Sequence, residues 1–127
     1  DQGAFGGISS EAFVILGDLN ASAEEGDAYK DGIQALLSHD AINANMIPTS
    51  KGATLHTKNS VYAATHTAFW RMRADYVLPS TKLGEVTDTG VFWPIPQDPL
   101  YRLIQNRQAS SDHRLVWVDV QLEAGQK

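Results

Sequence analysis

The sequence predicts a single domain of the α/β or α+β class, and three observations support this prediction. The chain has 127 residues, a length typical of one domain. Hydrophobic residues make up 43% of the chain and charged residues 20%, which is an ordinary globular composition. Short apolar runs rich in strand-forming residues are separated by one or two segments with helical periodicity, as expected for strands packed against a few helices.

Four segments are predicted to form strands. Residues 12–16 (AFVIL) and 74–78 (ADYVL) are short apolar runs, and the second of them is stopped by Pro79. Residues 85–92 (EVTDTGVF) are a third candidate. Residues 115–122 (LVWVDVQL) give the clearest strand pattern of the chain.

The segments between these strands predict two helices and one long loop. In residues 28–39, three apolar residues recur at the spacing of one helical face, which predicts a helix. A short helix is also expected over residues 100–108. Residues 43–68 mix Asn, Thr, Pro, Gly and His with few apolar stretches, so we expect a long surface connection there.

Composition excludes several classes of function. The chain contains no cysteine, so it has no disulfide framework, thiolate metal site or cysteine nucleophile. No apolar run approaches the ~20 residues that span a bilayer, so no membrane span is expected. A formal net charge of −5 argues against a protein that coats nucleic acid by charge alone. It does not argue against an enzyme that binds a phosphate through a local metal ion.

Three polar clusters lie at the ends of predicted strands. Asp18 and Asn20 are two residues apart, so in an extended chain both side chains face one site. Asp112 and His113 are adjacent and suit two separate roles, one binding a metal ion and the other facing the substrate. Asp75, in the second predicted strand, could then support the imidazole of His113 and raise its basicity.

Each cluster taken alone has a structural alternative. Asp and Asn after a strand commonly form turns by bonding to their own backbone, and an Asp-His pair is commonly a surface feature. A carboxylate at Asp75 could pair with Arg71 or Arg73 for structural reasons. The combination of the three clusters carries more weight than any one of them.

That combination resembles the endonuclease/exonuclease/phosphatase family of metal-dependent phosphoesterases. The matching stretches are GDLN at 17–20, RADYVL at 73–78 and SDH at 111–113, in the order of the family's motifs. Residues 73–80 and 110–119 further resemble a bacterial, often exported branch without a firmly assigned substrate. This branch would place the protein outside the cytoplasm, in the periplasm or secreted.

The resemblance implies a role for each motif residue. Asp18 matches the aspartate that positions or deprotonates the attacking water, and Asn20 matches the asparagine that contacts the scissile phosphate. Asp75 matches the aspartate hydrogen-bonded to the catalytic histidine, which is His113 here. Asp112 matches a carboxylate near the divalent metal ion. Mg²⁺ or Mn²⁺ is the expected cofactor, because Mg²⁺ prefers hard oxygen ligands and needs only one or two carboxylates.

Two further residues are candidates for substrate binding. Arg73 could contact a phosphate, although pairing near Asp75 is an equal alternative. His66 could also touch a phosphate, and Trp70 or Arg71 could line a substrate groove, although a structural role of these residues at the edge of the fold is favoured.

The resemblance also implies a DNase I-like fold, of which this chain would build one half. The family's main metal-binding glutamate lies upstream of the GDLN strand, and only 16 residues precede Gly17 here. We therefore expect a flexible lead-in over 1–11, the C-terminal part of the domain over 12–123 and a tail over 124–127. This half should contain one mainly antiparallel sheet layer with flanking helices. Apolar area left by the missing half would favour a homodimer or an added partner strand.

The predicted function is that of a divalent-metal-dependent phosphoester hydrolase, with the isolated chain incomplete for catalysis. The alternative is a non-catalytic binding or interaction module derived from the same fold. Within the enzyme class, a nuclease, a phosphodiesterase and a phosphatase of lipids or small molecules all remain open. The acidic balance of the chain does not favour long nucleic acid as the substrate.

Overall fold

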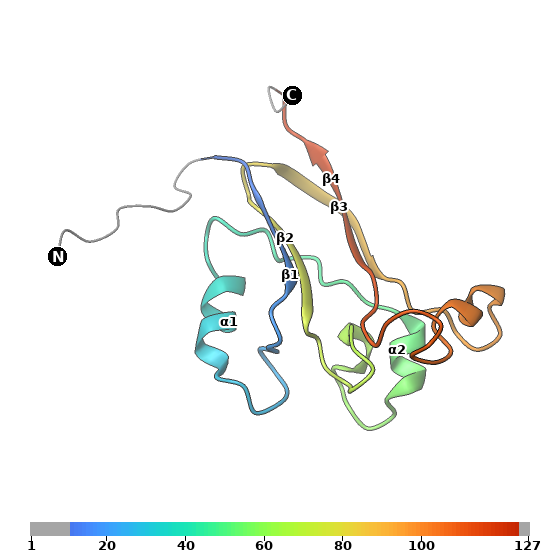
Figure 1. The fold of residues 1–127 in the computed structure, drawn as a ribbon. Coiled ribbons are helices and arrows are strands. Elements are labelled where there is room, and N and C mark those ends of the chain that lie inside the picture. Colours follow the sequence, from blue (N-terminus) through green and yellow to red (C-terminus); the bar gives the residue numbers. More distant parts are fainter. Residues whose placement is uncertain (1–10, 125–127) are drawn as a thin grey trace.

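A computed structural model of the chain describes residues 11–124 (Figure 1). The expected lead-in over 1–11 and tail over 124–127 therefore lie outside the described residues, apart from Glu11 and Ala124. The elements follow one another in the order β1 (Val14–Asp18), α1 (Lys30–Leu37), α2 (Lys51–His56), η1 (Ala63–Thr65), β2 (Asp75–Pro79), β3 (Gly84–Val91), η2 (Pro99–Leu103) and β4 (Val116–Leu122), where η denotes a 3₁₀ helix.

The described strands pair in twos, and both pairs are antiparallel. β1 pairs with β2, and β3 pairs with β4 (Figure 1). The predicted strands and the mixed α/β class are confirmed, as is the antiparallel pairing. The sheet is divided into two pairs, however, and does not form one continuous layer.

A short extended segment joins the two strand pairs at the end where the polar clusters lie. Ala68 forms isolated β-bridges with both Met72 and His113. The backbone N–H of Arg114 donates to the carbonyl of Thr67 at 2.7 Å. The chain before β2 is thereby held against the chain before β4, which brings distant parts of the sequence together.

One core lies between α1 and the β1–β2 pair. Tyr76 and Leu78 alternate with less buried residues along β2 and pack with Ile33 of α1 and with Ile42. Successive side chains of a strand point to opposite faces, so Asp75 faces away from this core. The alternation along β2 therefore places polar side chains such as Asp75 on the side of the strand pair that faces away from α1.

A second core lies beside α2, in the region expected to be a surface loop. Ser50 caps α2, because its hydroxyl accepts a hydrogen bond from the backbone N–H of Ala53 at 3.2 Å. Gly52 lies so close to the backbone and ring of Trp93 that a Cβ has no room there. The prediction of a long irregular surface connection over 43–68 is therefore wrong, because part of that segment forms helix α2 and packs into a core.

The two predicted helices have different outcomes. The first is confirmed as α1, within the predicted residues 28–39. The second is only the 3₁₀ helix η2, which the side chain of Asp98 caps through the N–H of Leu100 at 2.8 Å. A turn follows, in which Asn106 accepts from the N–H of Ala109 through both its carbonyl and its side chain, so the helix does not continue to residue 108.

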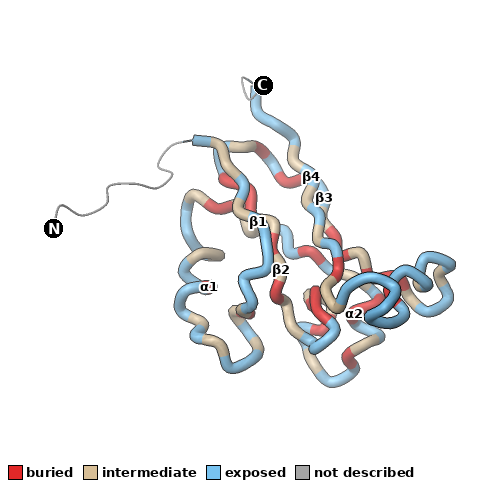
Figure 2. The backbone as a smooth tube through the Cα atoms, viewed as in Figure 1, coloured by how far each residue is buried: buried red, intermediate tan, exposed pale blue. Residues whose placement is uncertain are grey.

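One face of the strands carries exposed apolar side chains. Leu16 is 69% exposed and Leu115 is 67% exposed. Both border a shallow pocket that Val77, Asp18 and Asp75 also line. Figure 2 shows β1 and β4 as mostly exposed or half-buried, while β2 and β3 contain the buried positions. The apolar surface thus adjoins the polar clusters.

Neither α-helix among residues 11–124 has the length and apolar character required to cross a membrane.

Candidate active site

The pairing register of β1 and β2 places two carboxylates opposite each other. Asp18, the last residue of β1, pairs with Asp75, the first residue of β2. Like charges directly opposite on neighbouring strands repel each other, so this arrangement requires compensation by a cation or a hydrogen-bond donor. His113 supplies that donor.

The imidazole of His113 lies between the two carboxylates. Its Nδ1 lies 3.0 Å from Oδ1 and 2.9 Å from Oδ2 of Asp75. Because a carboxylate only accepts, Nδ1 carries the proton of this hydrogen bond. The other ring nitrogen, Nε2, lies 3.9 Å from Oδ2 of Asp18. The interaction expected between Asp75 and His113 is therefore present, and it leaves Nε2 on the side of Asp18.

These contacts raise the pKa of His113 above its ordinary value. The largest cause is the hydrogen bond to Asp75, with the negative charges of Asp75, Asp18 and Asp112 adding to it. Partial burial acts in the opposite direction and is outweighed. The carboxylates thus stabilise the imidazolium form relative to an imidazole in water.

Thr67, which the sequence analysis did not identify, fixes the carboxylate of Asp75. Its hydroxyl donates to Oδ2 of Asp75 at 2.7 Å and accepts from the backbone N–H groups of Ala74 and Asp75 at 2.9 and 3.0 Å. The side chain is buried, so water does not replace these partners. No motif signals this role, because Thr67 lies in a loop eight residues before Asp75.

Arg114, also missed, holds the loop that carries His113. Its guanidinium donates to the carbonyl oxygens of Ser111 at 2.8 Å and His113 at 3.2 Å, and it stacks over the ring of Trp93 at 4.7 Å. The residue is buried, and burial lowers the pKa of the guanidinium. Its position directly after the SDH stretch was the only sequence signal available.

Asp18 and Asn20 adopt a turn and still adjoin the histidine. Oδ1 of Asp18 accepts a hydrogen bond from the backbone N–H of Asn20 at 2.8 Å, which is the turn chemistry considered as an alternative. The backbone of Asn20 is left-handed, with φ 47°. The second oxygen of Asp18 remains directed toward His113. The turn and the cluster are therefore compatible.

Asp112 does not join this cluster. Its Oδ2 accepts from the guanidinium of Arg107 at 2.7 Å, and the pair lies near the surface. The three side chains brought together are Asp18, Asp75 and His113. Asp112 is thus paired with Arg107 through Oδ2, and its expected place near the metal ion stays a prediction.

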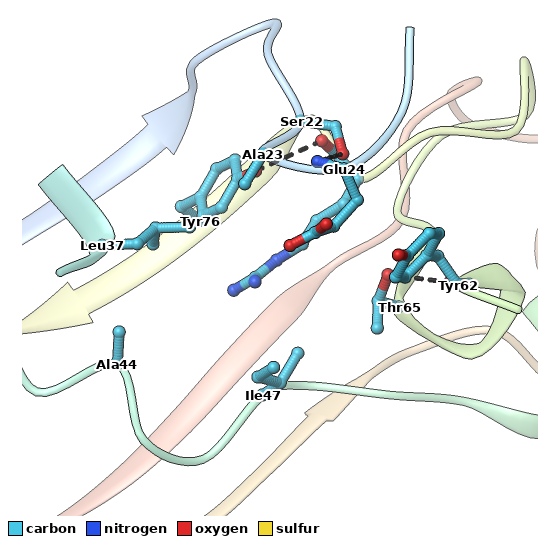
Figure 3. Close-up of a pocket in the computed structure, with 10 residues that line it drawn as sticks. Ser22, Ala23, Glu24, Leu37, Ala44, Ile47, Tyr62, Thr65 and Tyr76 are labelled. Carbon is cyan, nitrogen blue, oxygen red and sulfur yellow. Dashed lines mark hydrogen bonds between the residues drawn. The ribbon is translucent and has the colours of Figure 1, made fainter. Parts of the chain in front are cut away.

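Arg73 lies on the opposite side of β2 from the cluster. Its guanidinium stacks over the ring of Tyr76 at 4.4 Å. It also lines a cavity of about 220 Å³ near α1, which Leu37, Tyr62 and Tyr76 border (Figure 3). Arg73 therefore does not face the site where its predicted phosphate would bind.

His66 is buried and lies beside a carboxylate. Its exposed fraction is 0%, and its Nε2 lies 2.6 Å from Oε2 of Glu25. The same glutamate accepts from the hydroxyl of Ser60. His66 is therefore enclosed by the protein and paired with Glu25, and its proposed phosphate contact stays a prediction.

The cluster can be tested for its fit to a metal ion. One potential ligand atom from each of Asp18, Asp75 and His113 lies within 4.8 Å of the others. Nδ1 of His113 lies within hydrogen-bond distance of both carboxylate oxygens of Asp75. Asp18 is therefore the carboxylate of the cluster that is left to bind a metal ion. Mg²⁺ keeps several water ligands and is held by as few as one or two carboxylates. The residues fit a hydrated divalent ion bound through Asp18.

The chain is a small mixed α/β protein whose site holds a histidine between two carboxylates. A family model described as the Endonuclease/Exonuclease/phosphatase family matches residues 2–113. The chain belongs to this family, whose members are generally hydrolytic and generally use divalent metal ions. Comparisons with curated proteins and with solved structures gave no match.

Proposed function

We propose that this protein is a phosphoester hydrolase that depends on Mg²⁺ or Mn²⁺. The observation that carries the proposal is the convergence of Asp18, Asp75 and His113, which the β1–β2 register and the Ala68 bridge to His113 bring together. Phosphoester cleavage needs an oriented water, neutralisation of charge on the phosphoryl oxygens and a proton for the leaving oxygen. The cluster offers groups for the first and the third of these tasks.

The residues divide these tasks according to their contacts. Asp18 has one oxygen free of the turn and would orient or deprotonate the attacking water. The Asp75 carboxylate holds the imidazole of His113 so that Nε2 can carry a proton to or from the substrate. Asn20, at the exposed end of the turn, would hydrogen-bond a phosphoryl oxygen. When bound through Asp18, a divalent ion would neutralise charge on the phosphate.

The acidic balance of the chain favours a small phosphoester over a long nucleic acid. The formal net charge is −5, and non-specific nucleic-acid binding depends on many cationic contacts. Phosphoesters of small molecules need only a local site, so a phosphodiesterase or phosphatase activity fits the chain better than a nuclease activity.

The test uses the full-length protein and bis(4-nitrophenyl) phosphate. We expect hydrolysis with Mg²⁺ or Mn²⁺, its loss on adding EDTA, and a strong decrease in kcat/KM for Asp18→Ala. Asp88→Ala is the matched control, because Asp88 is an exposed aspartate of β3 outside the cluster. Full activity of Asp18→Ala would refute the proposal. Failure of the protein both to bind Mg²⁺ and to hydrolyse any phosphoester would favour the binding-module alternative.

A further inference from the structure

A cavity of about 380 Å³ opens directly beside the catalytic cluster. Asn20, the proposed phosphate contact, lines it together with Trp70, Arg71 and Met72. Asp27 also lines it. The cavity is thus bordered both by the proposed phosphate contact and by an aromatic side chain.

Trp70 connects this cavity to the catalytic histidine. Its indole meets the ring of His113 edge to face, with the ring centroids 4.8 Å apart. The residue remains 41% exposed, so part of its surface is available to a ligand. A large planar side chain that contacts the catalytic imidazole and stays accessible is suited to stacking against a planar substituent of the substrate.

Arg71 adds hydrogen-bond donors to the same cavity. No ion pair or side-chain hydrogen bond found among residues 11–124 involves its guanidinium, although Asp27 lines the cavity as well. Its backbone is left-handed, with φ 69°, which arginine rarely adopts. Asn20 and Arg71 are the two non-glycine residues with positive φ in the described part of the chain, and both line this cavity. Unusual backbone conformations cluster at ligand sites because they direct side chains that regular structure would not.

We propose that this cavity binds the organic substituent of the phosphate ester, and that this substituent is a planar aromatic ring stacked on Trp70. The inference rests on the proposed function and specifies its substrate class. Arg71 and Asp27 provide a donor and an acceptor for polar groups at the edge of the ring. An aliphatic substituent of the same phosphate would leave the indole face unused.

The kinetic test compares two diesters, benzyl methyl phosphate and cyclohexylmethyl methyl phosphate, of which only the first carries an aromatic ring. In the full-length protein, kcat/KM should be higher for the benzyl ester, and Trp70→Leu should reduce this preference by about 5- to 150-fold, the range of ring stacking on an aromatic side chain. Trp70→Phe should retain the preference. Tyr62→Leu is the matched control, because Tyr62 is 39% exposed and lines the other cavity.

A binding measurement is independent of turnover. The chain has three tryptophans, so Trp70→Phe assigns the indole N–H signal of Trp70 by its disappearance from the NMR spectrum. Phenylphosphonate should shift that signal, and ethylphosphonate should leave it unchanged.

The outcomes separate this inference from the proposed function. The inference is overturned if Trp70→Leu lowers kcat/KM equally for both esters, or if the wild-type protein shows no preference between them. Either result leaves the proposed hydrolase function unaffected. A phenylphosphonate shift without hydrolysis of either ester would refute the hydrolase and retain the aromatic site. If phenylphosphonate causes no shift and neither ester is hydrolysed, both proposals are overturned.

Discussion

Asp18 and Asp75 face each other across the antiparallel β1–β2 pair, and the imidazole of His113 lies 2.9 Å from the second and 3.9 Å from the first. Two carboxylates in register repel each other unless a donor or a cation lies between them. The same histidine therefore stabilises the strand ends and, in the proposed function, would supply the proton-transfer group. The pairing of the two strand ends and the proposed proton transfer therefore depend on the same side chain, that of His113.

Replacing Asp75 by asparagine should lower the pKa of His113. The hydrogen bond to Asp75 is the largest cause of the raised pKa, so its loss moves the pKa back toward the ordinary value of about 6.5. An NMR titration of the His113 imidazole in wild-type protein and Asp75→Asn measures this directly. An unchanged pKa would contradict the geometry.

The pH profile of hydrolysis should shift in the same direction. If protonated His113 acts as the acid, activity falls as pH rises through its pKa, and the raised pKa keeps the wild-type protein active to higher pH. The alkaline limb of kcat/KM should therefore lie at lower pH in Asp75→Asn. The free energy of unfolding should depend on pH in the same direction as the activity. The stabilisation by the His113 imidazolium is fully present below the unfolded-state pKa and is lost as pH rises through the folded-state pKa.

Removal of the Thr67 hydroxyl should destabilise the fold and loosen Asp75. Thr67→Val deletes three hydrogen bonds and leaves buried N–H groups without an acceptor, at a cost of about 1–3 kcal/mol in the free energy of unfolding. Thr67→Ser keeps the hydroxyl and should retain most of the stability. Urea unfolding of both variants measures the difference, and equal stability of the two would show that the hydroxyl is unimportant.

Arg114 should contribute much more than Arg107 to the free energy of unfolding. Arg114→Met removes a buried guanidinium that binds two loop carbonyls, and hydrogen bonds to charged groups contribute about 1.5–3 kcal/mol. Arg107→Met removes an exposed ion pair with Asp112, worth roughly 0–1 kcal/mol. Chemical unfolding should rank the two variants in this order. A reversed order would mean that Asp112, rather than Arg114, anchors the loop.

The exposed apolar face should promote association of the chain from 1 to 127. Leu16 and Leu115 lie on this face with most of their surface accessible. Contiguous apolar patches of this kind favour binding to another protein surface. Sedimentation velocity should show a dimer that Leu16→Glu weakens, whereas Val61→Glu, at a residue 91% exposed, should not. A compact monomer at all concentrations would contradict the expectation.

The strands were predictable from the sequence, but their register was not. Short apolar runs identified β1 and β2, the strand pattern of 115–122 identified β4, and β3 was a further candidate. Which residue of β1 lies opposite Asp75 depends on pairing between segments more than fifty residues apart, and no local pattern encodes it. The proximity of the polar clusters was therefore inferred from the family motifs and was then found in the register.

The failures have local physical causes. Helix α2 has six residues and includes Gly52, a weak helix former, so its stability comes from packing against Trp93, which only the fold reveals. The ion pair of Asp112 was not predictable because Arg107 is five residues away along a loop with no periodic structure. Thr67 had no signal at all, since a hydroxyl that orients a carboxylate needs only proximity in space.

The central claim is that His113 and Asp75 act as one catalytic unit, and a double-mutant cycle tests it most directly. Kinetics of phosphodiester hydrolysis by the full-length protein with Mg²⁺ would be measured for His113→Ala, Asp75→Asn and the double variant, with His39→Ala as an exposed-histidine control. We predict a loss of about 10²–10⁴-fold for His113→Ala and no further loss in the double variant. Losses that multiply, or wild-type activity in His113→Ala, would contradict the account.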